Sequence, residues 1–182
     1  MNWKPENGWF DECDVRKAIY PSLFAGGAGV TYGCHDVWQF WTPDRKPISA
    51  ARTPWQQALD LPAARQMKIV RTVMERPGFF ARVPDQSLIV SAPGNGGNRA
   101  IATRGVNRNW AMVYFPTTQP VTIDLSKLAG PVRAFWFNPQ NASYSVAGPF
   151  DNTGPHEFVP QSSTPLGEPI KDWILMLDAG KR

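Results

Sequence analysis

The spacing of apolar residues changes once along this chain, and that change divides the sequence into two parts. Before residue 80, apolar side chains recur three or four positions apart in two segments, Val15–Phe24 and Leu61–Glu75, which is the period of a helix. From Leu88 onward they alternate with polar ones, which is the period of a strand with one buried face. The chain must therefore combine helices with a sheet, and the boundary falls between Phe80 and Gln86.

The second part predicts short strands joined by turns. Val121–Leu125 alternates most clearly, with one buried and one wet face. Turn residues occur at Pro93–Asn98, at Gly148–Pro149 and at Pro155. Strands at this spacing favour an antiparallel β-sandwich over residues 83–182. The expected strands are Leu88–Ser91, Arg99–Arg104, Trp110–Phe115, Val121–Leu125, Val132–Asn138, Ser143–Val146, His156–Val159 and Trp173–Leu177.

The first part begins with a predicted helix over Val15–Phe24. Asp14 is the expected N-cap, since its side chain can accept hydrogen bonds from the first turn. Gly26 is expected to end the helix. Pro21 lies inside the segment and should kink or shorten it, because a proline in a helix interior costs about 3 kcal/mol.

A second helix is expected over Leu61–Glu75, with Asp60 as its N-cap and Pro62 in its first turn. Between the two helices, glycines around Thr31 and Tyr32 predict a strand packed closely against neighbours. A parallel strand needs neighbouring strands and helices on both sides of its sheet. Residues 1–82 therefore resemble the last piece of an α/β structure.

Composition argues against several classes of function. The net charge of +4 comes from scattered Lys and Arg, so no nucleic-acid partner is expected. The chain has no apolar run of the ~18 residues that a membrane helix needs. Cys13 and Cys34 lack metal-ligand spacing. Two free thiols are favoured, and a disulfide between them is the alternative. Pro93–Asn98 lacks the Lys and Ser/Thr of a phosphate loop. We expect no cofactor and no metal.

The candidate binding site follows the glycine-rich segment. Tyr32, His35, Trp38 and Gln39 combine flat aromatic faces with imidazole and amide groups. A sugar ring stacks its C–H faces on aromatic rings and exchanges hydrogen bonds through its hydroxyls. The alternative interpretation makes Trp38 and Trp41 residues of a core or an interface.

Several motifs follow one another along the chain. They are Asp14-Val15-Arg16-Lys17-Ala18, Leu23-Phe24-Ala25-Gly26, Thr31-Tyr32-Gly33, Val37-Trp38-Gln39, Arg82-Val83-Pro84-Asp85-Gln86, Trp136-Phe137-Asn138-Pro139 and Asp172-Trp173-Ile174-Leu175-Met176-Leu177-Asp178. In this order they resemble the end of the apiosidase-like glycoside hydrolases. In that family a (β/α)8 barrel is followed by a β-sandwich often labelled a "putative collagen-binding domain". The resemblance implies that residues 1–82 are the end of the barrel and residues 83–182 the sandwich.

The resemblance also implies which functional residues this chain carries. The family's two catalytic carboxylates are expected upstream of Met1, and Pro5-Glu6 does not match their Glu-Pro motif, so no catalytic residue is assigned. Barrel active sites lie at the C-terminal ends of strands, which places the segment from Tyr32 to Gln39 in a sugar subsite. The expected partners are a polysaccharide side chain and the missing barrel portion, and the parent enzyme is expected to be secreted or periplasmic. This chain alone is expected to be inactive.

Two other functions stay open for the second part. It could be a stand-alone carbohydrate- or collagen-binding module, with Trp110, Tyr114, Trp136 and Phe137 as a ligand platform. Alternating aromatic residues on strands are more often core. In the third interpretation the sandwich buttresses the barrel and binds nothing.

Overall fold

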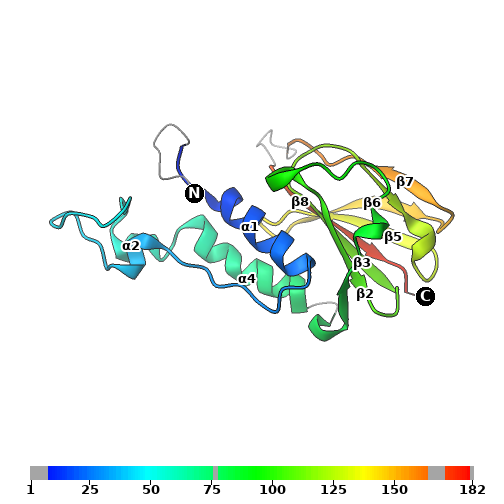
Figure 1. The fold of residues 1–182 in the computed structure, drawn as a ribbon, viewed down its shortest axis with the longest axis horizontal. Helices are drawn as coiled ribbons and strands as arrows, with labels where there is room; N and C mark the ends of the chain where they lie inside the picture. Colours follow the sequence, from blue (N-terminus) through cyan, green and yellow to red (C-terminus); the bar gives the residue numbers. More distant parts are fainter. Residues whose placement is uncertain (1–7, 76–77, 164–170, 181–182) are drawn as a thin grey trace.

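The computed structural model describes residues 8–75, 78–163 and 171–180. These residues form a mixed α+β structure in which helices pack against an antiparallel sheet (Figure 1). The helices are α1 (Glu12–Phe24), α2 (His35–Trp38), α3 (Trp55–Ala58) and α4 (Pro62–Glu75). The strands are β1 (Arg82–Pro84), β2 (Ile101–Gly105), β3 (Trp110–Phe115), β4 (Val121–Asp124), β5 (Val132–Phe137), β6 (Tyr144–Phe150), β7 (Pro155–Phe158) and β8 (Trp173–Asp178). None of the described helices is both long enough and apolar enough to cross a bilayer.

Six of the strands form one sheet in the order β1-β2-β3-β8-β5-β6, and β4 pairs with β7 in a second sheet. Every pair of neighbours is antiparallel. β3 has the predicted bounds, but the expected strand at Leu88–Ser91 was wrong. That segment begins in a 3-10 turn over Gln86–Leu88, and Ile89 makes a single bridge to Ile123. Asp85 caps the turn through the Ser87 amide, which favours the turn over a strand.

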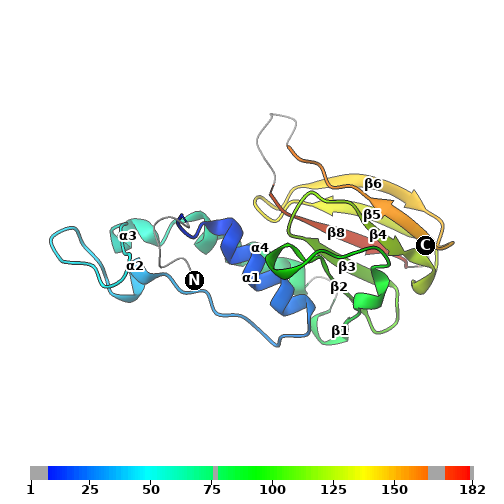
Figure 2. The same ribbon diagram turned by 45° about the horizontal axis from the view of Figure 1, so that its top comes forward.

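The six-stranded sheet is covered on both faces. Val113 and Tyr114 are neighbours on β3 and point to opposite sides, and both are fully buried. Val113 belongs to a core shared with β4 and β7, together with Trp136 and Ile123. Tyr114 belongs to a second core, in which α1 and α4 cover the other face. The sheet therefore lies between a helical layer and the two-stranded sheet (Figures 1 and 2).

The predicted turn at Gly148–Pro149 was also wrong, because both residues lie inside β6. β6 is an edge strand, and the register between β5 and β6 shifts at Ala134/Phe135. A proline is tolerated on an edge strand, where its missing N–H removes no bond between two central strands. Gly148 adopts a φ of 138°, which suits glycine next to the irregularity.

Helix α1 begins three residues earlier than the predicted Val15, because Asp11 rather than Asp14 is the N-cap. The Asp11 carboxylate accepts hydrogen bonds from the Cys13 and Asp14 amides, and the Asp14 carboxylate accepts one from the Asp11 amide. This reciprocal capping box fixes the start of the helix. The helix continues through Pro21 to Phe24, whose side chain is fully buried beneath it.

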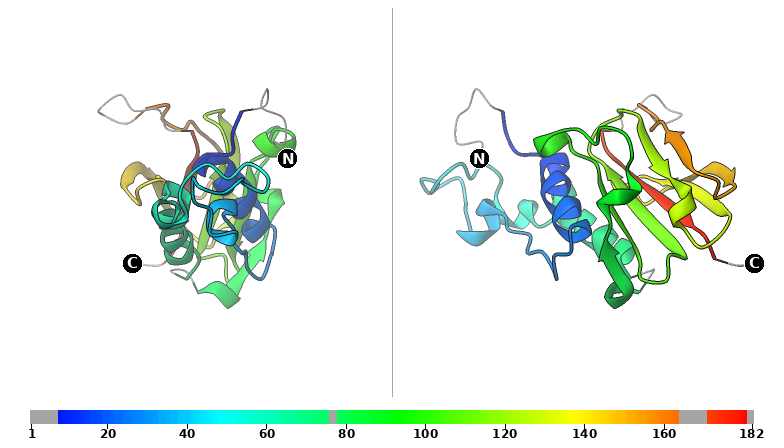
Figure 3. Two further views of the ribbon diagram at one scale, coloured as in Figure 1. Left: turned by 90° about the vertical axis from the view of Figure 1, so that its left-hand side faces the viewer. Right: turned by 45° about the vertical axis from the view of Figure 1, so that its right-hand side comes forward.

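The strand predicted at Thr31 and Tyr32 does not form. The described residues 29–34 are coil that runs into the single turn of α2. A strand requires a hydrogen-bonded neighbour, and in the described structure α2, α3 and the loop between them extend away from the sheet, beyond α1 and α4 (Figures 2 and 3). The glycine-rich segment therefore carries β-prone residues without a sheet to join.

Candidate functional site

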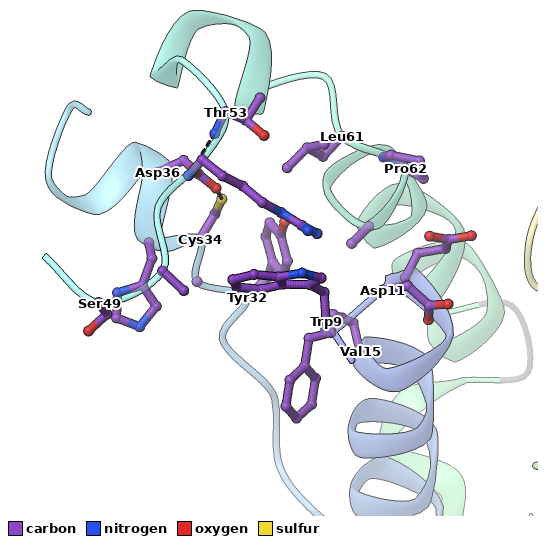
Figure 4. A pocket seen from close by; sticks show the side chains of 17 residues that line it. Trp9, Asp11, Val15, Tyr32, Cys34, Asp36, Ser49, Thr53, Leu61 and Pro62 are labelled. Carbon is purple, nitrogen blue, oxygen red and sulfur yellow. Dashed lines mark hydrogen bonds between the residues drawn. The ribbon is translucent and has the colours of Figure 1, made fainter. Parts of the chain in front are cut away.

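A pocket of about 520 Å³ lies where α2 and the loop before α3 meet the starts of α1 and α4 (Figure 4). Its walls come from the start of α1, the segment before and within α2, the loop before α3, and the start of α4. The lining residues are Trp9, Phe10, Asp11, Glu12, Val15, Tyr32, Gly33, Cys34, His35, Asp36, Ser49, Ala50, Arg52, Thr53, Leu61, Pro62 and Ala63.

Trp9 and Phe10 give the pocket an apolar wall that the sequence analysis missed. Both side chains are about half exposed. The Arg52 guanidinium carbon lies 4.4 Å from the centroid of the Trp9 ring, a cation–π arrangement across the pocket. The sequence signal for this wall was the Asp11/Asp14 capping box. It fixes the start of α1 and therefore places Phe10 directly before the helix.

Tyr32 and His35 are the predicted site residues that line the pocket. Tyr32 is half-buried, and burial together with the neighbouring Cys34 and Asp36 raises its pKa to about 12. Its phenol is therefore neutral at neutral pH and can both donate and accept a hydrogen bond.

Trp38 and Gln39 are not among the described residues that line the pocket. Trp38 is 68% exposed and packs edge-to-face on His35, with ring centroids 5.9 Å apart. The Gln39 amide donates to the Ile48 carbonyl (2.9 Å) and accepts from the Ile48 amide (2.8 Å). Gln39 thus holds the loop before α3 against α2, while Trp38 stands on the surface beside the pocket.

Asp36 holds the opposite end of the same loop. Its Oδ1 accepts hydrogen bonds from the backbone amides of Arg52 (2.7 Å) and Thr53 (2.9 Å), and its Oδ2 accepts one from the Cys34 thiol (3.4 Å). Burial alone would raise the pKa of Asp36, but these donors outweigh it and hold the pKa below its ordinary value. The ionised carboxylate therefore places Arg52 over the pocket.

The pocket wall has three carboxylates, and two of them are already engaged. Asp36 binds the loop, and Asp11 caps α1 and accepts a hydrogen bond from the Lys171 ammonium (2.7 Å). Glu12 completes the set. These described residues do not supply the free pair of carboxylates that glycoside hydrolysis normally uses, so no catalytic residue is assigned. Glu6 lies outside the described residues.

The cysteines and the aromatic residues on the strands are the remaining candidate groups. Cys13 and Cys34 are both free thiols. The described part of the chain contains no group of three or more potential metal ligands among His, Cys, Asp and Glu. The ligand platform considered for the strands is not exposed, because three of its four aromatic residues, Tyr114, Trp136 and Phe137, are buried in the two cores.

Trp110 is different, because it lines a groove of about 380 Å³ on the helical side of the sheet. The groove lies beside the last turn of α4, where Val73 borders it. Its aromatic and sulfur-containing walls are Trp110, Met112, Phe135, Tyr144 and Met176.

Comparison with known proteins identifies the class to which these features belong. Residues 1–81 match the family model described as "Apiosidase-like, catalytic domain", and residues 83–178 match "Putative collagen-binding domain of a collagenase". A solved structure described as "Glycoside hydrolase" is 36% identical with a TM-score of 0.88; the alignment covers 100% of this chain and 40% of that one. A family 5 glycoside hydrolase from Bacteroides vulgatus is 34% identical with a TM-score of 0.85, covering 96% and 37%. No curated protein gives a significant match.

The fold is thus that of a region of glycoside hydrolases, and the pocket lies in the part that matches their catalytic domain. Residues 83–178, just over half of the chain, belong to the family described as a putative collagen-binding domain of a collagenase, and residues 1–81 are similar to the apiosidase-like catalytic domain. The chain spans about two fifths of the length of the solved relatives described above.

Proposed function

We propose that this chain is the C-terminal part of a glycoside hydrolase that acts on polysaccharide side chains. Residues 1–82 are the end of its (β/α)8 barrel domain, and residues 83–182 are an accessory β-sandwich. The barrel portion contributes the wall of a sugar subsite, and the catalytic carboxylates belong to the rest of the barrel.

The pocket between α1, α2 and α4 carries this proposal. Tyr32 and Trp9 offer aromatic surface for the C–H face of a sugar ring. Arg52 and His35 offer polar groups for the ring hydroxyls. Trp38 extends the aromatic surface outward for a neighbouring sugar unit.

Gln39 contributes indirectly to this subsite, by holding the loop that carries Arg52. Both polar atoms of its amide are bound to Ile48, so its role is to shape the wall rather than to contact the sugar. The engaged state of Asp11 and Asp36 predicts binding without hydrolysis.

Isothermal titration of the purified chain with a panel of plant and bacterial oligosaccharides tests this proposal. We expect binding that Tyr32→Ala weakens by about fivefold, from the loss of one aromatic contact. Trp110→Ala, on the far side of α4, is the matched control and should leave the affinity unchanged. The same samples should release no sugar. Hydrolysis that disappears when Glu12 is changed to Gln would contradict the proposal.

A second candidate function is a carbohydrate- or collagen-binding module in the second part of the chain. The groove beside α4 favours it, because Trp110, Phe135 and Met176 form an aromatic and apolar surface next to the Arg133–Asp178 ion pair. The titration above separates the two functions. Under this alternative Trp110→Ala abolishes binding of an oligosaccharide or a collagen peptide, and Tyr32→Ala has no effect.

A further inference from the structure

Two consecutive residues near the end of the described chain, Lys171 and Asp172, reach back to helix α1. Asp172 is fully buried and precedes β8 directly. Its two oxygens receive a bidentate pair of hydrogen bonds from Arg16: Nε donates to Oδ2 at 2.9 Å, and Nη2 donates to Oδ1 at 2.7 Å. Arg16 is itself fully buried in α1. The fork geometry fixes the rotation of the helix about its axis as well as its distance from the sheet.

The same buried cluster reaches α4 and β3. The remaining terminal nitrogen of Arg16, Nη1, donates to Gln66 Oε1 at 2.6 Å, and Gln66 lies on α4. The Tyr114 hydroxyl on β3 donates to Asp172 Oδ2 at 3.0 Å. The Asp172 carboxylate therefore holds α1 directly, and α4 through Arg16.

Lys171 binds the first residue before α1, which is nearer to the pocket than Arg16. Its ammonium donates to Asp11 Oδ2 at 2.7 Å, while Asp11 Oδ1 accepts from the amides of Cys13 and Asp14. Asp11 is both the N-cap of α1 and a lining residue of the pocket, and it directly follows Trp9 and Phe10 in the wall. The Lys171–Asp11 ion pair therefore holds the start of α1, where the pocket wall continues into the helix.

We propose that Lys171 and Asp172 are positioning residues of the pocket: the C-terminal region holds the wall formed by residues 9–15 in place from outside the pocket. Neither residue lines the pocket, so both act through Asp11 and Arg16. The accessory region is then part of the construction of the site rather than an independent appendage. This inference takes its functional meaning from the proposed sugar subsite, although the geometric coupling itself needs no ligand.

Hydrogen exchange measured by mass spectrometry on the full chain without sugar tests the coupling. Lys171→Met should raise exchange about two- to fivefold in peptides spanning residues 8–16, which is the range for losing an exposed ion pair. Peptides from β3 and β5 should not change. Lys171→Arg, which keeps the charge, should restore protection. Arg133→Met is the matched control, because it breaks an ion pair of similar exposure on the sheet, away from the pocket wall.

Faster hydrogen exchange in residues 8–16 of Lys171→Met, reversed in Lys171→Arg and absent from Arg133→Met, supports the proposal even if no sugar binds in the titration. Unchanged exchange in residues 8–16, or loosening that spreads equally to β3 and β5, overturns it even if sugar binding is confirmed.

Discussion

Neutralising Asp172 should destabilise the whole described fold. Asp172→Asn keeps the shape of the side chain but removes its charge, while Arg16 remains fully buried. Breaking a buried ion pair by removing one partner costs about 3–5 kcal/mol, because the other charge stays in a low-dielectric site. Tyr114 also loses a charged acceptor. Since domains are stable by only about 5–15 kcal/mol, this is a large fraction of the total.

Urea unfolding followed by circular dichroism measures this loss as a lower midpoint at an unchanged slope. Arg16→Met should cost a similar amount. The double variant removes both charges, so it should lose less than the sum of the single variants, by about 2 kcal/mol or more. Asp178→Asn, which breaks an exposed pair with Arg133, is the control and should cost less than about 1 kcal/mol. The reasoning is refuted if Asp172→Asn stays within about 1 kcal/mol of the wild type or if the two single variants add.

Two further predictions test the packing and the loop. Gly105→Ala should lower stability by about 1–3 kcal/mol in calorimetry, since its Cβ would lie 2.6 Å from Trp110 Nε1, whereas Gly97→Ala meets no atom within 4 Å and should be neutral. Asp36→Asn should weaken the hold on the loop before α3, seen as faster proteolysis at neutral pH. Because folding lowers the pKa of Asp36, its stabilisation is complete above the unfolded value of about 3.9 and is lost as pH falls through the folded pKa. The difference between wild type and variant should therefore shrink below about pH 4; a constant difference would contradict this assignment.

The elements that the sequence predicted well carry their own signals. β3 was placed at its observed bounds because Trp110–Phe115 is a continuous apolar run bounded by turn residues. α4 was placed to within one residue because Pro62 marks a first turn. β1 was missed because Arg82–Pro84 is three residues long and contains a proline, so only its pairing with β2 makes it a strand.

The candidate site shows the same limit. Tyr32 and His35 could be grouped from sequence because they are close in the chain and share an aromatic, polar segment. Trp9 and Arg52 meet only in the fold, and the hydrogen bonds that bring Arg52 there come from the side chain of Asp36. Gln39 looked like a ligand group because its amide is polar, but the nearby Ile48 backbone satisfies that amide. Sequence patterns identify residues able to bind sugar; the loop geometry decides which of them face the pocket.

The ion pair between Arg16 and Asp172 argues against treating the two matched regions as separable modules. Arg16 lies in the region matched as a catalytic domain, and Asp172 lies in the region matched as a collagen-binding domain. Neither charge has water to replace its partner, because both side chains are fully buried. A C-terminal region isolated from α1 and α4 would also expose Tyr114, Phe137 and Ile174, which the helices now cover. The face of the C-terminal region that meets α1 and α4 needs both a buried charge partner and an apolar cover, so it is part of the protein interior. The boundary near residue 82 separates two parts of the sequence that share this core.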